Sequence, residues 1–219
     1  MIDGLAERIA GLRAEIDAAA VAAGRRAGSV RLLGVSKRQS RERVLAAIEA
    51  GLALVGENYV QEAKAKFAGL PPVERHFIGH VQTNKAKAIV EQFDVVQSID
   101  RWEAGLAVAR AADRLSRRQP VLIQINVSPA ERFGVAPSEA QALAERLRAI
   151  GLEVDGVMAI GPAGADRGRV RDAFALAART FAGVGGTTLS IGMSGDWREA
   201  VAAGSTMIRL GTALFGARA

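Results

Sequence analysis

The chain has 219 residues, 49% of them hydrophobic, so it can bury a sizeable core, and we expect a single domain over residues 1–219. Cysteine is absent, which excludes disulfides, thiolate catalysis and cysteine-ligated metal sites and indicates a cytoplasmic protein. The formal net charge of +6 favours an anionic partner, a phosphate ligand or a nucleic acid, and no apolar run is long enough to span a membrane.

The first predicted element is an amphipathic helix at the N-terminus. Ile2, Leu5, Ile9, Leu12 and Ile16 recur at steps of three and four, which places one apolar stripe along the helix. Acidic residues lie within this pattern, unlike the basic and then apolar order of a secretory signal. We expect the helix to cover the main body of the protein.

Eight short apolar runs follow, separated by alanine- and arginine-rich helical patterns. The runs are RLLGVS, LALVG, HFIG, DVVQS, PVLIQIN, EVDGVMAI, TTLSIG and TMIRLG. Parallel strands need crossover helices and are buried on both faces, so this alternation predicts a parallel sheet covered by helices. Eight units favour an α/β fold of the closed (β/α)8 TIM-barrel type. An open doubly wound sheet is the alternative, although SKRQSRER follows the first run where that fold usually has a glycine-rich turn.

Lys37 directly follows the first apolar run. In a barrel this is the end at which ligands bind. A surface lysine that begins a loop is the simpler interpretation, because lysine is rarely buried. The functional interpretation is a Schiff-base lysine, since a partly desolvated amine at a barrel mouth can condense with an aldehyde. That hypothesis requires a carbonyl ligand nearby.

The last third of the chain offers groups that could hold a phosphate. LSIGMSGDWREAVAAG and RLGTALFGAR each place glycine, serine or threonine at a strand end before a helical pattern, where backbone N–H groups can bind an anion. A turn with a helix cap is the alternative for either stretch. Arg209 lies within the eighth run and needs a partner, either a ligand ring atom or a carboxylate.

Motifs along almost the whole chain carry a resemblance to a known family. GVSK, GENYVQEAK, HFIGHVQTNK, QINVS, VMAIGP, LSIGMSGDW and AGSTMIRLGTALFGAR, in that order, resemble the pyridoxal phosphate homeostasis proteins. The resemblance implies a barrel like the alanine racemase N-terminal domain, the fold type III of pyridoxal phosphate proteins, with an extra N-terminal helix. It also implies a cytoplasmic monomer that takes part in pyridoxal phosphate homeostasis and delivers the cofactor to apo-enzymes.

The resemblance also assigns roles around the cofactor ring. Lys37 would hold pyridoxal 5'-phosphate as a covalent aldimine, and Asn58 would lie near the ring as a hydrogen-bonding group. Arg209 would face the pyridine nitrogen. A permanently charged arginine disfavours a proton on that nitrogen and so weakens the ring as an electron sink. We therefore expect a carrier without robust catalysis and without catalytic residues.

The remaining assignments concern the phosphate and the pocket walls. The resemblance implies that Ser194, Gly211 and Thr212 bind the phosphate through hydroxyl and backbone donors. His76 and Met158 are candidates for lining the pocket. A hydrogen-bonded packing role for His76 and a core role for Met158 are the simpler interpretations.

A Schiff-base enzyme of the amino-acid racemase type, with weak or unidentified activity, is the alternative function. The alanine racemases that the chain resembles pair the lysine with a tyrosine from a separate β-domain, and because the sequence ends at Ala219 we expect no such domain here. The single tyrosine, Tyr59, could lie near the pocket, although a buried tyrosine that packs beside a strand is the expected role.

Two further partners are not expected. His76 and His80 lack the set of acidic and cysteine ligands that a complete metal site would need beside them in sequence, so we expect no metal. Basic stretches such as GRRAG and RLSRRQ alternate with alanine on helical faces, and few aromatic residues are available for stacking, so we expect no nucleic acid. His80 stands where the family often has proline, in GHVQTNK instead of GPLQSNK, and this departure affects the expected loop shape.

Overall fold

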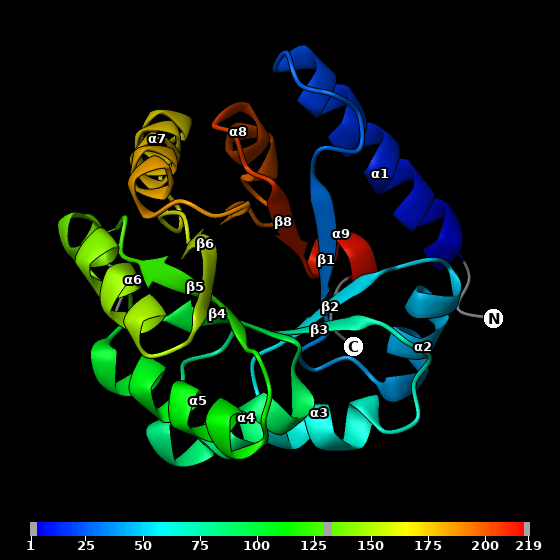
Figure 1. Cartoon of the computed structure of the whole chain (residues 1–219). Coiled ribbons are helices and arrows are strands. Elements are labelled where there is room, and N and C mark those ends of the chain that lie inside the picture. The colour runs from blue at the N-terminus through cyan, green and yellow to red at the C-terminus, as the bar shows by residue number, and fades with distance from the viewer. Residues whose placement is uncertain (1–3, 129–132, 217–219) are drawn as a thin grey trace.

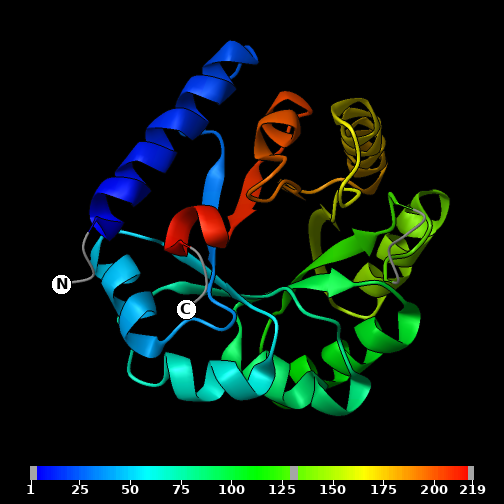
Figure 2. The same cartoon turned by 180° about the vertical axis from the view of Figure 1, so that it is seen from behind.

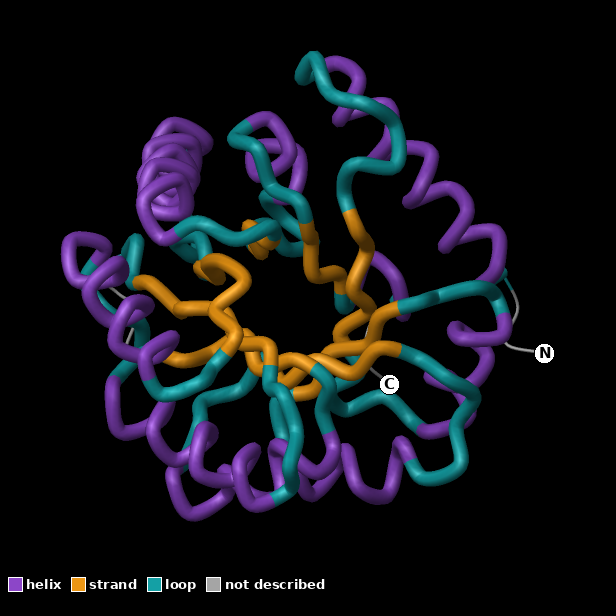
Figure 3. The backbone as a smooth tube through the Cα atoms, viewed as in Figure 1, coloured by secondary structure: helices purple, strands orange, loops and turns teal. Residues whose placement is uncertain are grey.

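The computed structural model describes residues 4–128 and 133–216. Its eight parallel strands close into a barrel in sequence order, with β1 paired to both β2 and β8. Figure 3 shows the strands as an inner ring surrounded by helices. The closed order confirms the predicted (β/α)8 barrel and excludes the open doubly wound sheet.

The strands largely match the apolar runs. They are β1 (Arg31–Val35), β2 (Leu54–Glu57), β3 (Glu74–Phe77), β4 (Val95–Ile99), β5 (Pro120–Ile125), β6 (Glu153–Ala159), β7 (Thr188–Ser190) and β8 (Met207–Leu210). β3 begins two residues before the HFIG run and ends at Phe77, the second residue of that run. The strand begins earlier than the apolar pattern because its first residues, Glu74 and Arg75, are polar but pair with Leu54 and Val55 of β2.

Helices follow each strand and also precede the first. They are α1 (Leu5–Ala22), α2 (Arg41–Glu49), α3 (Val60–Phe67), α4 (Ala86–Gln92), α5 (Trp102–Arg114), α6 (Ala140–Ala149), α7 (Arg167–Val184), α8 (Trp197–Ala202) and α9 (Thr212–Phe215), with short 3₁₀ turns at η1 (Thr83–Lys85) and η2 (Pro137–Glu139). None of the helices in the described part of the chain is long and apolar enough to cross a bilayer.

The N-terminal helix completes the outer ring of helices. α9 has only four residues, so the last strand lacks the covering helix that a barrel unit normally supplies. α1 packs against α8, α9 and α2, and Figures 1 and 2 show it between α8 and α2. Leu5, Ile9 and Ile16 are buried there, as the apolar stripe predicts, whereas Ile2 lies outside the described residues. α1 is therefore a ring helix supplied from the other end of the chain.

The interior of the barrel is apolar in one part and polar in another. Leu33, Leu54 and Met207 form a small apolar cluster separate from the main core between sheet and helices. Buried polar side chains, Arg209 among them, occupy other interior positions. A polar interior needs hydrogen-bond partners, and these partners define the candidate site.

Candidate functional site

Lys37 lies in the turn that follows β1, two residues beyond the end of the strand. Its side chain is partly buried. Among the described residues, none forms a hydrogen bond or ion pair with its amine. The next residue, Arg38, has a φ of 60°, a left-handed conformation that non-glycine residues rarely adopt. The structure thus presents an unpaired amine on a sharply turned backbone.

A buried ion pair that the sequence analysis missed lies beside this turn. Lys66 Nζ is 2.6 Å from Glu57 Oε2, and the two side chains are 7% and 0% exposed. Glu57 ends β2 and Lys66 lies in α3. The signal was present in the sequence, because Glu57 follows LALVG as a charge at the end of an apolar run. The partner nine residues later could not be identified without the fold.

Arg209 is held inside the barrel by oxygen atoms of two other strands. Its Nη1 donates to Ser190 O (2.6 Å) and Ser190 Oγ (2.8 Å), and its Nη2 donates to Ala159 O (2.8 Å). Burial lowers the pKa of Arg209 to about 10, against the opposing effect of Asp196, so the group stays charged at neutral pH. These contacts with described residues use three of the five N–H groups of the guanidinium.

A chain of hydrogen bonds leads from Arg209 to the opposite end of the barrel. Ser190 Oγ donates to Gln97 Oε1 (2.7 Å), and Gln97 Nε2 donates to His76 Nδ1 (2.8 Å). His76 Nε2 therefore carries the proton and donates it to Glu74 Oε1 (2.8 Å). Burial lowers the pKa of His76. Both ring nitrogens of His76 are therefore hydrogen-bonded, and a series of three hydrogen bonds connects the ring to Arg209.

The residues that are predicted to bind the phosphate lie together after β7 and β8. Ser194 Oγ accepts a hydrogen bond from Ala213 N (3.3 Å), so the two loops are in contact. A Cβ on Gly211 would lie 3.7 Å from Val35 Cβ, which places this glycine beside the end of β1. Thr212 begins α9. The structure thereby brings Ser194, Gly211 and Thr212 to the end of the barrel that carries Lys37.

A small cavity of about 170 Å³ opens beside Asn58, with Tyr59 and His80 also in its wall. Asn58 Oδ1 is buried without a hydrogen-bond partner among the described residues. His80 stacks on Phe133, with ring centroids 4.1 Å apart. Tyr59 is 47% exposed, so the prediction of a buried tyrosine is wrong. The reason is local, because Tyr59 precedes α3 with an extended backbone (φ −124°, ψ 118°) and is not part of the helix.

Met158 is buried in β6, where it is in register with Ser190 of β7. Residues in register on parallel strands point to the same side of the sheet, so Met158 faces the interior with Ser190. The described residues contain no group of three or more histidine, aspartate or glutamate side chains that could hold a metal ion.

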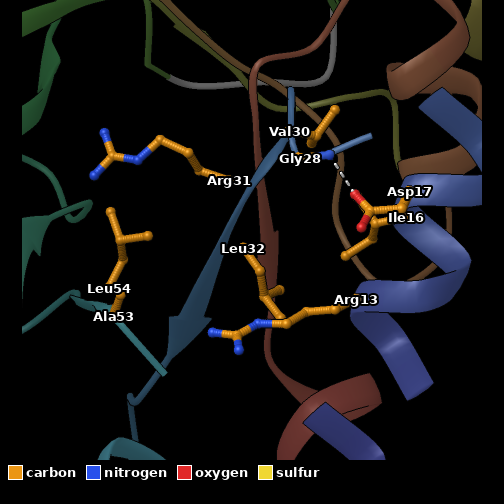
Figure 4. Close-up of a pocket in the computed structure, with 9 residues that line it drawn as sticks. All are labelled: Arg13, Ile16, Asp17, Gly28, Val30, Arg31, Leu32, Ala53 and Leu54. Carbon is orange, nitrogen blue, oxygen red and sulfur yellow. Dashed lines mark hydrogen bonds between the residues drawn. The ribbon is translucent and has the colours of Figure 1, made fainter. Parts of the chain in front are cut away.

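A second cavity, of about 300 Å³, lies at the opposite end of the barrel (Figure 4). It lies between α1 and the beginnings of β1 and β2, and none of the predicted site residues lines it. Its charged groups already have protein partners, since Asp17 Oδ1 accepts from Gly28 N (2.7 Å) and Arg13 Nη2 donates to Gly51 O (2.6 Å). The candidate site is therefore the end that carries Lys37.

Comparison with known proteins gives consistent results. The family model described as the alanine racemase N-terminal domain matches residues 12–219. The pyridoxal phosphate homeostasis proteins of Pseudomonas aeruginosa and Escherichia coli K12 are 42% and 38% identical, covering 98% and 99% of this chain and 96% and 98% of their own. The solved structure of PipY from Synechococcus elongatus PCC7942, with PLP bound, is 35% identical with a TM-score of 0.86, covering 97% of this chain and 100% of that one.

Proposed function

The chain belongs to the family of pyridoxal phosphate homeostasis proteins, built on the alanine racemase N-terminal domain, and from this membership we propose that it binds pyridoxal 5'-phosphate (PLP) and takes part in PLP homeostasis. The observation that carries the proposal is the amine of Lys37, which has no partner among residues 4–128 and 133–216 and lies at the same barrel end as the Ser194 and Thr212 loops. We further propose one domain and a cytoplasmic monomer that passes PLP to apo-enzymes.

The chemistry of the residues present fits this cofactor. PLP has an aldehyde, a phosphate, a hydroxyl substituent on the ring and a pyridine nitrogen, and these groups accept or donate hydrogen bonds. Within the described part of the chain, Lys37 offers an amine without a competing partner, and Asn58 offers a buried carbonyl oxygen that accepts no hydrogen bond. An unpaired buried acceptor is unfavourable by about 1–3 kcal/mol, so a ligand that supplies a donor gains affinity there.

In this proposal each residue keeps the role that the family resemblance implies. PLP supplies an aldehyde that condenses with a lysine amine, forming a carbon–nitrogen double bond and releasing the aldehyde oxygen as water. Lys37 provides the amine and Asn58 binds near the ring. The hydroxyl and backbone donors of Ser194, Gly211 and Thr212 bind the phosphate.

Arg209 supports a carrier function in preference to carbanion chemistry. The guanidinium is buried and positively charged at neutral pH. A positive charge facing the pyridine nitrogen disfavours protonation of that nitrogen, and an unprotonated ring is a weaker electron sink. The relatives are named as homeostasis proteins. We therefore propose that the protein holds and releases PLP without robust turnover.

The test is a visible absorption spectrum with added PLP, followed by borohydride reduction and peptide mass mapping. A yellow band whose label maps to Lys37 is the expected result. Lys37→Ala should lose the band while Ser194, Gly211 and Thr212 still bind PLP non-covalently, which dialysis against radiolabelled PLP can measure. Label scattered over surface lysines in the parent protein would contradict the proposal.

A racemase-type enzyme remains the second candidate, and the exposure of Tyr59 beside Asn58 is the observation that favours it. A phenol there could act as an acid or base toward an amino acid. Exchange of the α-hydrogen of alanine in D₂O, abolished by Tyr59→Phe, would support this candidate. Equal exchange in the presence of the parent protein and of free PLP would rule it out.

A further inference from the structure

Buried charged side chains hold Ser36, the residue that precedes Lys37 in its turn. Ser36 O accepts a hydrogen bond from Lys66 Nζ (2.6 Å), and Ser36 Oγ donates to Glu57 Oε2 (3.1 Å). Ser36 N also donates to Gly56 O (2.8 Å). Ser36 and Glu57 are fully buried, and Lys66 is 6% exposed. The residue before Lys37 therefore has every polar group engaged.

The residue after Lys37 is held by the same group of charges. Arg38 N donates to Glu62 Oε2 (3.0 Å), and the same oxygen lies 3.3 Å from Lys66 Nζ. Arg38 has a left-handed backbone, which is unfavourable for a side-chain-bearing residue unless its surroundings hold it. Lys66 Nζ thus connects the carboxylate of Glu62, which binds Arg38 N, to the backbone carbonyl oxygen of Ser36.

The other oxygen of Glu57 serves the neighbouring loop. Glu57 Oε1 accepts hydrogen bonds from Asn58 N (2.7 Å) and Tyr59 N (3.3 Å). One buried carboxylate therefore joins the turn that carries Lys37 to the loop that carries Asn58. Two groups proposed to contact PLP share a single rigid support.

Resting on the proposed function, we propose that Lys66, through its ion pair with Glu57, is a positioning residue that holds the Lys37 amine where it can react with the aldehyde of PLP. A buried ion pair is a weak source of stability, because the loss of hydration offsets much of the attraction. Holding a reacting group in place is a different effect, since a displacement of about 1 Å can lower a rate about a hundredfold.

Lys66 is not itself the group that reacts with the aldehyde. Its ammonium has three donors, and three acceptors surround it, namely Ser36 O, Glu57 Oε2 and Glu62 Oε2. Lys37 has none of these restraints on its side chain. The structure therefore separates a reacting lysine from a supporting lysine.

The experiment compares covalent and non-covalent binding in Lys66→Met and the parent protein. Borohydride trapping of PLP on Lys37 should slow between about ten- and a hundredfold in the variant. Binding of pyridoxine 5'-phosphate, which has an alcohol in place of the aldehyde, should change by less than about threefold, because it does not use the amine. Lys87→Met is the matched control, since the Lys87 side chain is 72% exposed and, among the described residues, pairs only with Glu91.

Two additional variants keep the test informative if Lys66→Met fails to fold. Glu57→Gln combined with Lys66→Met removes both charges and leaves no buried unpaired carboxylate. Ser36→Ala removes the hydroxyl that contacts Glu57 Oε2 and Gly56 O, keeps the Lys66–Glu57 ion pair, and should give a smaller loss in the same direction. A folded variant lacking Lys66 that traps PLP on Lys37 at the parent rate would overturn the inference.

Amide hydrogen exchange in the absence of PLP separates this inference from the proposed function. Loss of Lys66 should speed exchange of the Arg38 amide, which Glu62 protects, and leave strand amides of β5 unchanged. If the parent traps no PLP but exchange still rises, the cofactor function is wrong and the support of the turn stands. Unchanged exchange at Arg38 would remove the positioning role even if PLP binds.

Discussion

Arg209 is hydrogen-bonded inside the barrel and is also the residue that we propose to face the pyridine nitrogen of PLP. Its side chain satisfies two carbonyl oxygens and a hydroxyl on neighbouring strands. The same burial lowers its pKa to about 10, and the group remains charged at neutral pH. Its structural and chemical contributions can be separated by comparing substitutions that keep or remove the charge.

Replacing Arg209 with lysine or with glutamine provides that comparison. Both substitutions leave at least one of the oxygen atoms that Arg209 contacts on Ser190 and Ala159 without its donor. Each should therefore lower the free energy of unfolding by about 1–3 kcal/mol in urea denaturation. Only Arg209→Gln removes the positive charge, so the absorption maximum of the PLP-loaded protein should shift in this variant and much less in Arg209→Lys. Identical spectra in the two variants would remove Arg209 from the vicinity of the pyridine nitrogen.

His76 predicts a pH dependence of stability. Burial lowers its pKa in the folded protein, whereas the unfolded value is about 6.5. Below that pH the unfolded chain binds the proton more readily, so the free energy of unfolding falls as the pH is lowered, by at most about 1.4 kcal/mol per pH unit. Glu74, whose pKa is lowered first of all by its hydrogen bond with His76, loses its stabilising contribution only at lower pH, below about 4.5.

Denaturation at pH 7.5 and pH 5.5 tests this effect. The parent should lose about 1 kcal/mol more than His76→Gln between these values, because glutamine can still accept from Gln97 but does not titrate. Parallel pH profiles would mean that His76 is solvated in the folded protein.

At the scale of elements, the contact between two loops shapes the site near Asn58. Gly79 follows β3, and a Cβ at this position would lie 2.1 Å from Asn58 O, a backbone atom that cannot move aside easily. Gly79→Ala should therefore displace the Asn58 loop, lower the free energy of unfolding by about 1–3 kcal/mol and weaken PLP binding.

Gly11→Ala is the matched control for this substitution. A Cβ at Gly11 meets nothing within 4 Å, and the residue lies within α1. The change should stabilise the protein by about 0.5–1 kcal/mol and leave PLP affinity unaltered. Normal PLP affinity in Gly79→Ala, measured by titration of the absorption band, would show that the two loops are independent.

At the scale of the whole molecule, closure of the helix ring depends on α1. This helix fills the place beside β8 that the four-residue α9 leaves open. Ile9 and Ile16 are each 1% exposed in that interface. We expect α1 to unfold together with the barrel.

Ile16→Ala tests this cooperativity. It should lower the free energy of unfolding by about 2–5 kcal/mol while keeping one unfolding transition that circular dichroism and tryptophan fluorescence report alike. Val21→Ala is the control, because Val21 lies on the same helix but is 57% exposed. Two separate transitions, or an early loss of helix signal alone, would show that α1 is an independent appendage.

Much of the fold and part of the site follow from the sequence alone. Eight apolar runs separated by helical patterns predict the barrel because a buried parallel strand must be apolar on both faces. Lys37 and Arg209 stand out because a charge at the end of or inside such a run needs a reason. The pairing of the two loops after β7 and β8 followed from their places in the chain, whereas the choice of Ser194, Gly211 and Thr212 within them came from the family resemblance.

Only the tertiary structure decided which polar groups meet. Glu57 and Lys66, and the chain from Arg209 through Ser190 and Gln97 to His76, join residues whose spacing in sequence carries no signal for contact. Tyr59 was predicted to be buried, and its exposure depends on where α3 begins. Apolar patterning is a local property that the sequence records, whereas hydrogen-bond partners are chosen by the closure of the barrel, which brings distant strand ends together.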